Sequence, residues 1–200
     1  MPAKPNSLQL LLFLLLVVLA LGGAAIFKGA LFLGKHEGDA FHLLDILGRM
    51  KLGQVPHLDF MTPIGGLAVW PIVTGLDVGL SAGHAFLWAQ VGVAMLALPA
   101  IWWVGMSRLS MLQALAFGAI CLTLILALVH GQADRGLSVS MHYNRWAWAA
   151  AVVALAVAIL PTRQGGTRWD GTIIGMSLSA LALIKMTFFV AFAGPVLLAL

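Results

Sequence analysis

Charged residues are scarce in this chain. Only 9% of its 200 residues are Asp, Glu, Lys or Arg, while 62% are hydrophobic and the mean hydropathy is +1.02. This composition excludes an ordinary soluble domain and indicates an integral membrane protein with several spans and lipid as its surroundings. The small net charge of +4 is spread over loops, so it informs membrane topology and argues against nucleic acid as a partner.

Cysteine is nearly missing as well. Cys121 is the single one and lies inside an apolar run, so an intrachain disulfide is excluded and we interpret it as a buried, inert thiol. With one cysteine and no His-x-x-x-His spacing inside a span, the sequence argues against a zinc site or a haem. We expect the histidines to hydrogen-bond lipid headgroups or phosphates; they are His36, His42, His57, His84, His130 and His142.

Long apolar runs are abundant, and they predict an all-α polytopic membrane protein with five spans. A span needs about 20 apolar residues, and helices alone satisfy their own backbone in lipid. We treat residues 1–200 as one transmembrane domain. The first run is longer than the core of a signal peptide, so we expect it to stay as a span. The predicted spans are 8–27, 82–104, 109–129, 146–160 and 171–193.

The loop charges predict an orientation. Lys4, Arg108, Arg163 and Arg168 fall on one side in short segments with a single acid, Asp170, which favours the cytoplasm for that side. The opposite loops hold more basic residues in total, so the raw count points the other way. We predict a bacterial inner-membrane protein with a cytoplasmic N-terminus. Its first outer loop would be residues 28–81.

Acidic residues concentrate in that outer loop. Glu37 and Asp39 lie two positions apart, and either could act as a general base toward an acceptor hydroxyl or as a ligand for a divalent cation. The alternative for Asp39 is a first-turn acid stabilised by a helix dipole. Asp59, together with His57, lies on a Pro-bounded stretch that could fold back toward the acidic pair.

Residues 38–52 predict an interfacial amphipathic helix. Asp39, His42, Asp45 and Arg49 recur at spacings of three and four, which places them along one face. An i,i+4 ion pair is the simplest explanation of Asp45 and Arg49. The residues expected to rest on the bilayer surface are Leu43, Leu44, Leu47 and Met50, whereas Ile46 would fall near the polar face.

Two further places carry candidate substrate-binding residues. Tyr143, Asn144 and Arg145 precede the fourth predicted span and could hold a phosphate or a sugar, with ordinary interfacial anchoring as the alternative. Lys185 lies inside the fifth predicted span, where a charge is costly unless it is paired or hydrated. We therefore expect an inward-facing partner, either an acid from a loop or a lipid phosphate; snorkelling is the alternative.

The order of these motifs resembles the GT-C membrane glycosyltransferases, most closely the protein O-mannosyltransferase and aminoarabinose-transferase branch. The resemblance covers about residues 8–80, with Glu-Gly-Asp where many relatives have an adjacent Asp-Glu. It implies sugar transfer from a polyprenyl-phosphate donor on the non-cytoplasmic face, with Asp39 or Glu37 as base or metal ligand. The matching residues are Glu37, Asp39, Arg49, Gly53, Pro56, Asp59, Pro63, Gly65, Gly66, Trp70 and Pro71.

Two function classes follow from this sequence. The first is a lipid-phosphate-dependent glycosyltransferase, with a divalent cation as its conceivable cofactor. The second is a non-catalytic subunit of a larger membrane complex, because the many Gly and Ala residues of the later spans suit close helix packing; a transporter ranks third. The chain ends within an apolar stretch, so we expect it to be the N-terminal portion of a longer protein.

Overall fold

A computed structural model describes residues 5–29, 38–127, 142–163 and 168–200. Within these ranges the regular structure is helical, which confirms the all-α prediction. The helices are α1 (Ser7–Lys28), α2 (Gly38–Lys51), the 3-10 helix η1 (Gly66–Ala68), α3 (Trp70–Asp77), α4 (Ala82–Arg108), α5 (Met111–Leu126), α6 (His142–Ile159), α7 (Arg168–Ile184) and α8 (Met186–Leu198).

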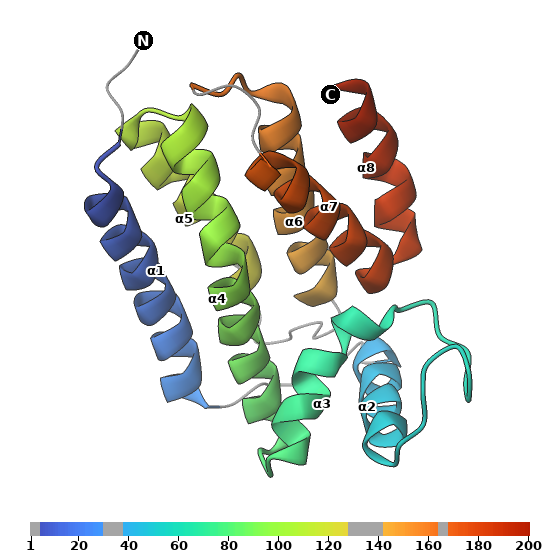
Figure 1. Cartoon of the computed structure of the whole chain (residues 1–200). Coiled ribbons are helices and arrows are strands. Elements are labelled where there is room, and N and C mark those ends of the chain that lie inside the picture. The colour runs from blue at the N-terminus through green and yellow to red at the C-terminus, as the bar shows by residue number, and fades with distance from the viewer. Residues whose placement is uncertain (1–4, 30–37, 128–141, 164–167) are drawn as a thin grey trace.

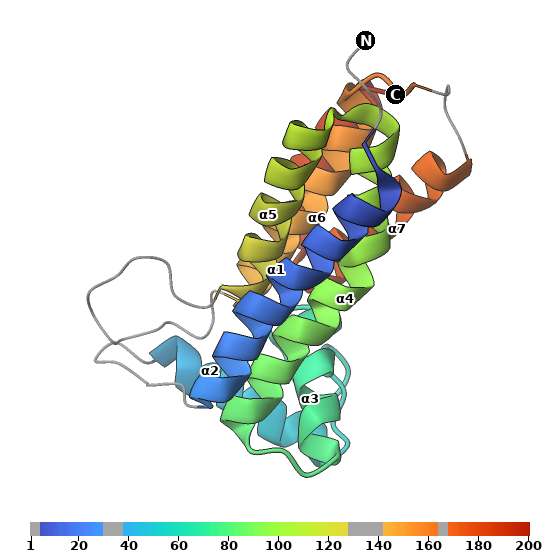
Figure 2. The ribbon, with the colours of Figure 1, turned by 90° about the vertical axis from the view of Figure 1, so that its left-hand side faces the viewer.

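The long helices form a bundle with shorter elements across one end. Helices α1, α4, α5 and α6 run along the bundle, and α4 packs against α1, α3 and α5. Helices α2 and α3 lie at the end where α4 and α6 begin (Figures 1 and 2). We call this the α2–α3 end. The start of α1 and the end of α8 lie at the opposite end.

Two helices, α1 and α4, are long and apolar enough to cross a membrane. Helices α5 and α8 are apolar but shorter. Large side chains of α1 face outward, including Leu12, Leu16 and Leu19, which are 56%, 60% and 71% exposed. Asn6 begins α1 by accepting a hydrogen bond from the backbone N–H of Gln9. The first two predicted spans are therefore confirmed as helices of the expected lengths.

The prediction of one continuous span over residues 171–193 is wrong. The chain leaves the helical conformation at Lys185, where φ is −166° and ψ is 119°, and α8 then turns back toward the opposite end (Figure 1). Helices α7 and α8 pack together as a hairpin with Lys185 at its tip. The carbonyl oxygen of Ile184 accepts a hydrogen bond from the N–H of Gly65, 2.8 Å away. A loop distant in sequence thus supplies the hydrogen bond for a carbonyl group at the break in the helix.

Helix α2 forms where the amphipathic pattern predicted it, but its apolar face meets protein instead of lipid. Leu43, Ile46 and Leu47 are each 1% exposed, and α2 packs against α3. The expected position of Ile46 near the polar face is wrong, because it belongs to the buried face. The predicted ion pair between Asp45 and Arg49 is confirmed, with 2.8 Å between Oδ2 and Nε.

A buried ion pair joins helices at the opposite end. Arg108 of α4 lies 3.0 Å from Asp170 of α7, and their side chains are 3% and 10% exposed. The indole N–H of Trp103 donates to the same carboxylate, and Arg108 also donates to the carbonyl of Val157 in α6. Residues that the sequence presented as loop charges therefore connect three helices inside the protein.

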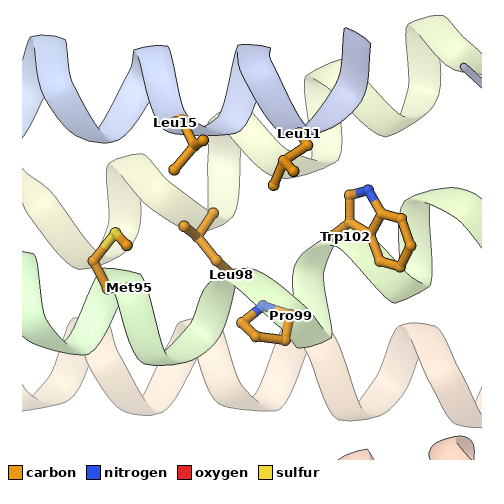
Figure 3. A pocket seen from close by; sticks show the side chains of 6 residues that line it. All are labelled: Leu11, Leu15, Met95, Leu98, Pro99 and Trp102. Atoms are coloured by element: carbon orange, nitrogen blue, oxygen red, sulfur yellow. The ribbon is translucent and has the colours of Figure 1, made fainter. Parts of the chain in front are cut away.

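An apolar groove of about 400 Å³ lies between α1 and α4 (Figure 3). It sits beside Pro99, which interrupts the backbone hydrogen bonding of α4 because proline has no N–H. The lining of the groove is almost entirely apolar. Its lining residues are Leu11, Leu15, Met95, Leu98, Pro99 and Trp102.

Candidate functional site

Lys185 contacts Tyr143, the chain's single tyrosine, near the α2–α3 end, and the charge of Asp39 influences the same phenol. Tyr143 lies in the first turn of α6, before the predicted span 146–160, and is buried. The ammonium of Lys185 lies 5.7 Å from the centroid of its ring. Burial raises the pKa of Tyr143, and the negative charge of Asp39 raises it further. The ammonium of Lys185 thus lies over the phenol ring, and the carboxylate of Asp39 acts on the same phenol through its charge.

Asp39 lies in the first turn of α2 and is exposed. The unpaired backbone N–H groups at a helix start interact favourably with an acidic residue in the first turn. An accessible carboxylate can also act as a general base toward a substrate hydroxyl. The first-turn role and the general-base role that the sequence suggested are therefore compatible with the same geometry.

Lys185 owes its position to the break between α7 and α8. It precedes α8, whose first turn has no side-chain cap, so backbone N–H groups and the ammonium contribute positive charge in the same region. The side chain is half-buried instead of lying within a continuous span. This combination suits an anionic group such as a phosphate.

Gly65 brings the loop before η1 directly against this break. Its N–H donates to the carbonyl of Ile184, and a Cβ at this position would overlap the carbonyl oxygen of Leu183. Two backbones approach so closely that glycine alone fits without a shift. Gly65 is the first residue of the Gly-Gly pair that carried part of the family resemblance. The close approach explains why glycine occupies this position.

We expect Gly65→Ala to lower the free energy of unfolding by about 1–3 kcal/mol, because the added methyl group forces the loop away from the hairpin. Gly48→Ala is the matched control. Gly48 lies within α2 with open space around it, so alanine should stabilise that helix by about 0.5–1 kcal/mol. Thermal unfolding of the purified protein in detergent measures both. Equal stability of Gly65→Ala and the unchanged protein would disprove the close approach.

His142 fixes α6 beside η1. Its side chain is fully buried, and its Nε2 donates to the carbonyl of Ala68 over 2.8 Å. Its ring meets those of Phe86, Tyr143 and Trp146 edge-on. The expectation that this histidine faces lipid headgroups is wrong. It orients the first turn of α6, and with it Tyr143.

Arg145 is directed away from Tyr143, toward the end of α5. The guanidinium of Arg145 donates to the carbonyl of Ala127, the residue that follows α5. A cation at this place satisfies a terminal carbonyl and complements the negative end of the helix dipole. Asn144 is half-buried. The three residues predicted to bind a phosphate or a sugar together are thus divided, because the guanidinium of Arg145 is directed to α5.

The candidates on the loop after α2 form local contacts. The carboxylate of Asp59 accepts a hydrogen bond from the N–H of Val55 at 2.6 Å, which closes the loop on itself. Arg49 pairs with Asp45 and lies over the ring of Phe60. His57 is exposed and has a positive φ of 68°. Their contacts explain how the loop is shaped, and substrate binding by them stays a prediction.

Some predicted residues lie outside the described ranges, namely Glu37, His36 and His130. Within those ranges no three His, Cys, Asp or Glu side chains are grouped closely enough to hold a metal ion. The sequence interpretation missed the contact between Gly65 and Ile184, although the Gly-Gly pair after Pro63 was its signal. Comparisons with known protein families, curated proteins and solved structures gave no match.

Proposed function

We propose that the protein is a polytopic membrane glycosyltransferase that moves a sugar from a polyprenyl-phosphate donor to an acceptor hydroxyl. The observation that supports this most is the contact of the Lys185 ammonium with the ring of Tyr143, a phenol on which the charge of Asp39 also acts. These residues come from α2, α6 and the α7–α8 break, which are far apart in the sequence. Each was singled out for transfer chemistry on separate grounds.

The three groups suit the charges of such a transfer. The acceptor oxygen attacks the anomeric carbon of the sugar, and its proton passes to the carboxylate of Asp39. The bond between the sugar and the phosphate breaks, and polyprenyl phosphate leaves with the electron pair. Lys185 offsets the charge on the leaving phosphate, and the protonated phenol of Tyr143 can donate a hydrogen bond to it.

The position of the site near one end of the helices suits a lipid-linked donor. Helices α1 and α4 can span a bilayer, and we propose that the other long helices complete a polytopic domain. The donor tail would stay in hydrocarbon while its sugar reaches the aqueous end. With the N-terminus in the cytoplasm of a bacterium, the α2–α3 end faces outward from the inner membrane.

A second function class, the non-catalytic membrane subunit, is favoured by one observation. Gly171, Gly175 and Ser179 are exposed along α7 at a spacing of four, with open space around both glycines. Small residues at this spacing let another membrane helix approach closely. A subunit of this kind would need neither a basic carboxylate nor a phosphate-binding lysine.

Donor binding distinguishes the two classes. We expect Lys185→Met to weaken binding of a polyprenyl-phosphate analogue by about tenfold or more, because a hydrogen bond to a charged group contributes about 1.5–3 kcal/mol. Lys185→Arg should keep part of the affinity, since the charge remains while the geometry changes. The measurement is equilibrium binding to the purified protein in nanodiscs.

Lys28→Met, at the exposed end of α1, makes the same chemical change away from the hairpin and should leave the affinity unchanged. Thermal unfolding is recorded for every variant. Unaltered affinity of Lys185→Met together with a clear loss of stability would identify Lys185 as a structural residue. That result would favour the subunit.

A further inference from the structure

The loop between α2 and η1 displays large apolar side chains to its surroundings. Leu52, Leu58 and Met61 are 84%, 83% and 83% exposed, and Val55 is 41% exposed. Four such residues within residues 52–61, which we call the 52–61 loop, form an apolar surface. An exposed apolar cluster of this kind marks contact with lipid or with another protein.

Most backbone N–H groups of this loop are satisfied from within. From residue 52 to residue 59 every backbone N–H donates to an acceptor inside the loop or α2, over 2.6–3.2 Å, and Pro56 has no N–H to satisfy. Backbone donors must be satisfied internally in a medium without water, so this favours lipid. The acceptors are the carbonyls of Gly48, Arg49, Met50, Val55 and Phe60 and the carboxylate of Asp59.

Two polar side chains in and beside the loop, Asp59 and Arg49, make internal contacts, whereas Gln54 and His57 are exposed. Asp59 turns its carboxylate to the N–H of Val55, and Arg49 lies over the ring of Phe60 while it pairs with Asp45. These contacts hold the loop in one shape while its apolar side chains face outward. Lys51, which precedes the loop, is exposed and provides a positive charge beside the apolar surface.

We propose that the 52–61 loop inserts its apolar side chains into the boundary between lipid headgroups and acyl chains at the α2–α3 end. The loop projects sideways from the bundle, past α2 (Figure 1), and the charge of Lys51 complements anionic headgroups. The apolar face of α2 is buried against protein, so the loop takes over the bilayer contact that the sequence assigned to that helix. Because α2 carries both Asp39 and the loop, insertion would hold Asp39 at a fixed depth.

The proposal goes beyond the transferase function and does not depend on it. The test uses the whole chain with Cys121→Ala, so that a thiol-reactive NBD fluorophore reacts at one introduced cysteine. Leu58→Cys reports on the loop, and Gly48→Cys, at an exposed position of α2 with open space around it, is the control. Both proteins are placed in nanodiscs of phosphatidylcholine and phosphatidylglycerol.

We expect the probe at position 58 to show blue-shifted emission, to lose emission with brominated acyl chains and to resist aqueous iodide. The probe at position 48 should show the reverse pattern. Quenching at position 58 by iodide, without quenching by brominated lipid, would overturn the proposal. Protection from both quenchers would also overturn it, because the loop would then be covered by protein, such as a second copy of the chain.

Discussion

Asp39→Asn is expected to lower the rate of sugar transfer by about 100-fold or more, because it removes the general base. Asparagine has nearly the same shape as aspartate, so α2 should lose only the modest attraction between a first-turn charge and the helix dipole. The measurement is release of polyprenyl phosphate from a panel of polyprenyl-phosphate sugars by the purified protein. Thermal unfolding checks that the variant stays folded.

Asp45→Asn is the matched control for that experiment. Asp45 belongs to the same helix, and its partner is the exposed guanidinium of Arg49. Losing an exposed ion pair changes stability little and should leave turnover nearly unaltered. If Asp39→Asn turned over the donor at the unchanged rate, Asp39 would be left with its role at the helix start. Glu37→Gln would then test the other acid.

Asp170→Ala is expected to lower the free energy of unfolding by about 3–5 kcal/mol, because it leaves the buried guanidinium of Arg108 without its counter-charge. The indole N–H of Trp103 loses its acceptor in the same variant. Denaturant or thermal unfolding of the purified protein in detergent measures the change. The effect should exceed that of Asp45→Asn, which breaks an exposed pair of the same kind.

The double variant Arg108→Met, Asp170→Leu separates charge from packing. Replacing both members of a buried pair with apolar residues of similar size is often neutral or stabilising, so we expect most of the lost stability to return. A loss below about 1 kcal/mol in Asp170→Ala would show that water or another residue takes over the role of the carboxylate. The double variant would then bring no recovery.

The sequence predicted the individual helices better than their surroundings. Apolar runs located α1 and α4, and the spacing of Asp45 and Arg49 located α2, because these signals are local. The burial of Ile46 was not predictable, since the amphipathic pattern does not say whether a face will meet lipid or protein. The sequence likewise could not tell an apolar hairpin from one long span.

The candidate site shows the same difference between local features, which the sequence predicts, and long-range contacts, which it does not. Asp39, Tyr143 and Lys185 each stood out by residue type and position, yet the contact between Tyr143 and Lys185 depends on long-range packing. Asp59 illustrates the opposite case. Its carboxylate resembled a substrate ligand in the sequence, whereas the structure shows it bonded to an N–H four residues away. Short polar side chains commonly form such local bonds, and no spacing rule separates these from binding residues.

The bond from Gly65 to Ile184 has a consequence for biosynthesis. A chain is made from its N-terminus, so Gly65 leaves the ribosome well before the α7–α8 hairpin exists. Asp39 and Tyr143 are likewise synthesised before Lys185. Until the hairpin forms, the N–H of Gly65 is bonded to water or to a temporary partner. The contact between Tyr143 and Lys185 therefore forms late, and nascent chains that stop within α7 would lack it.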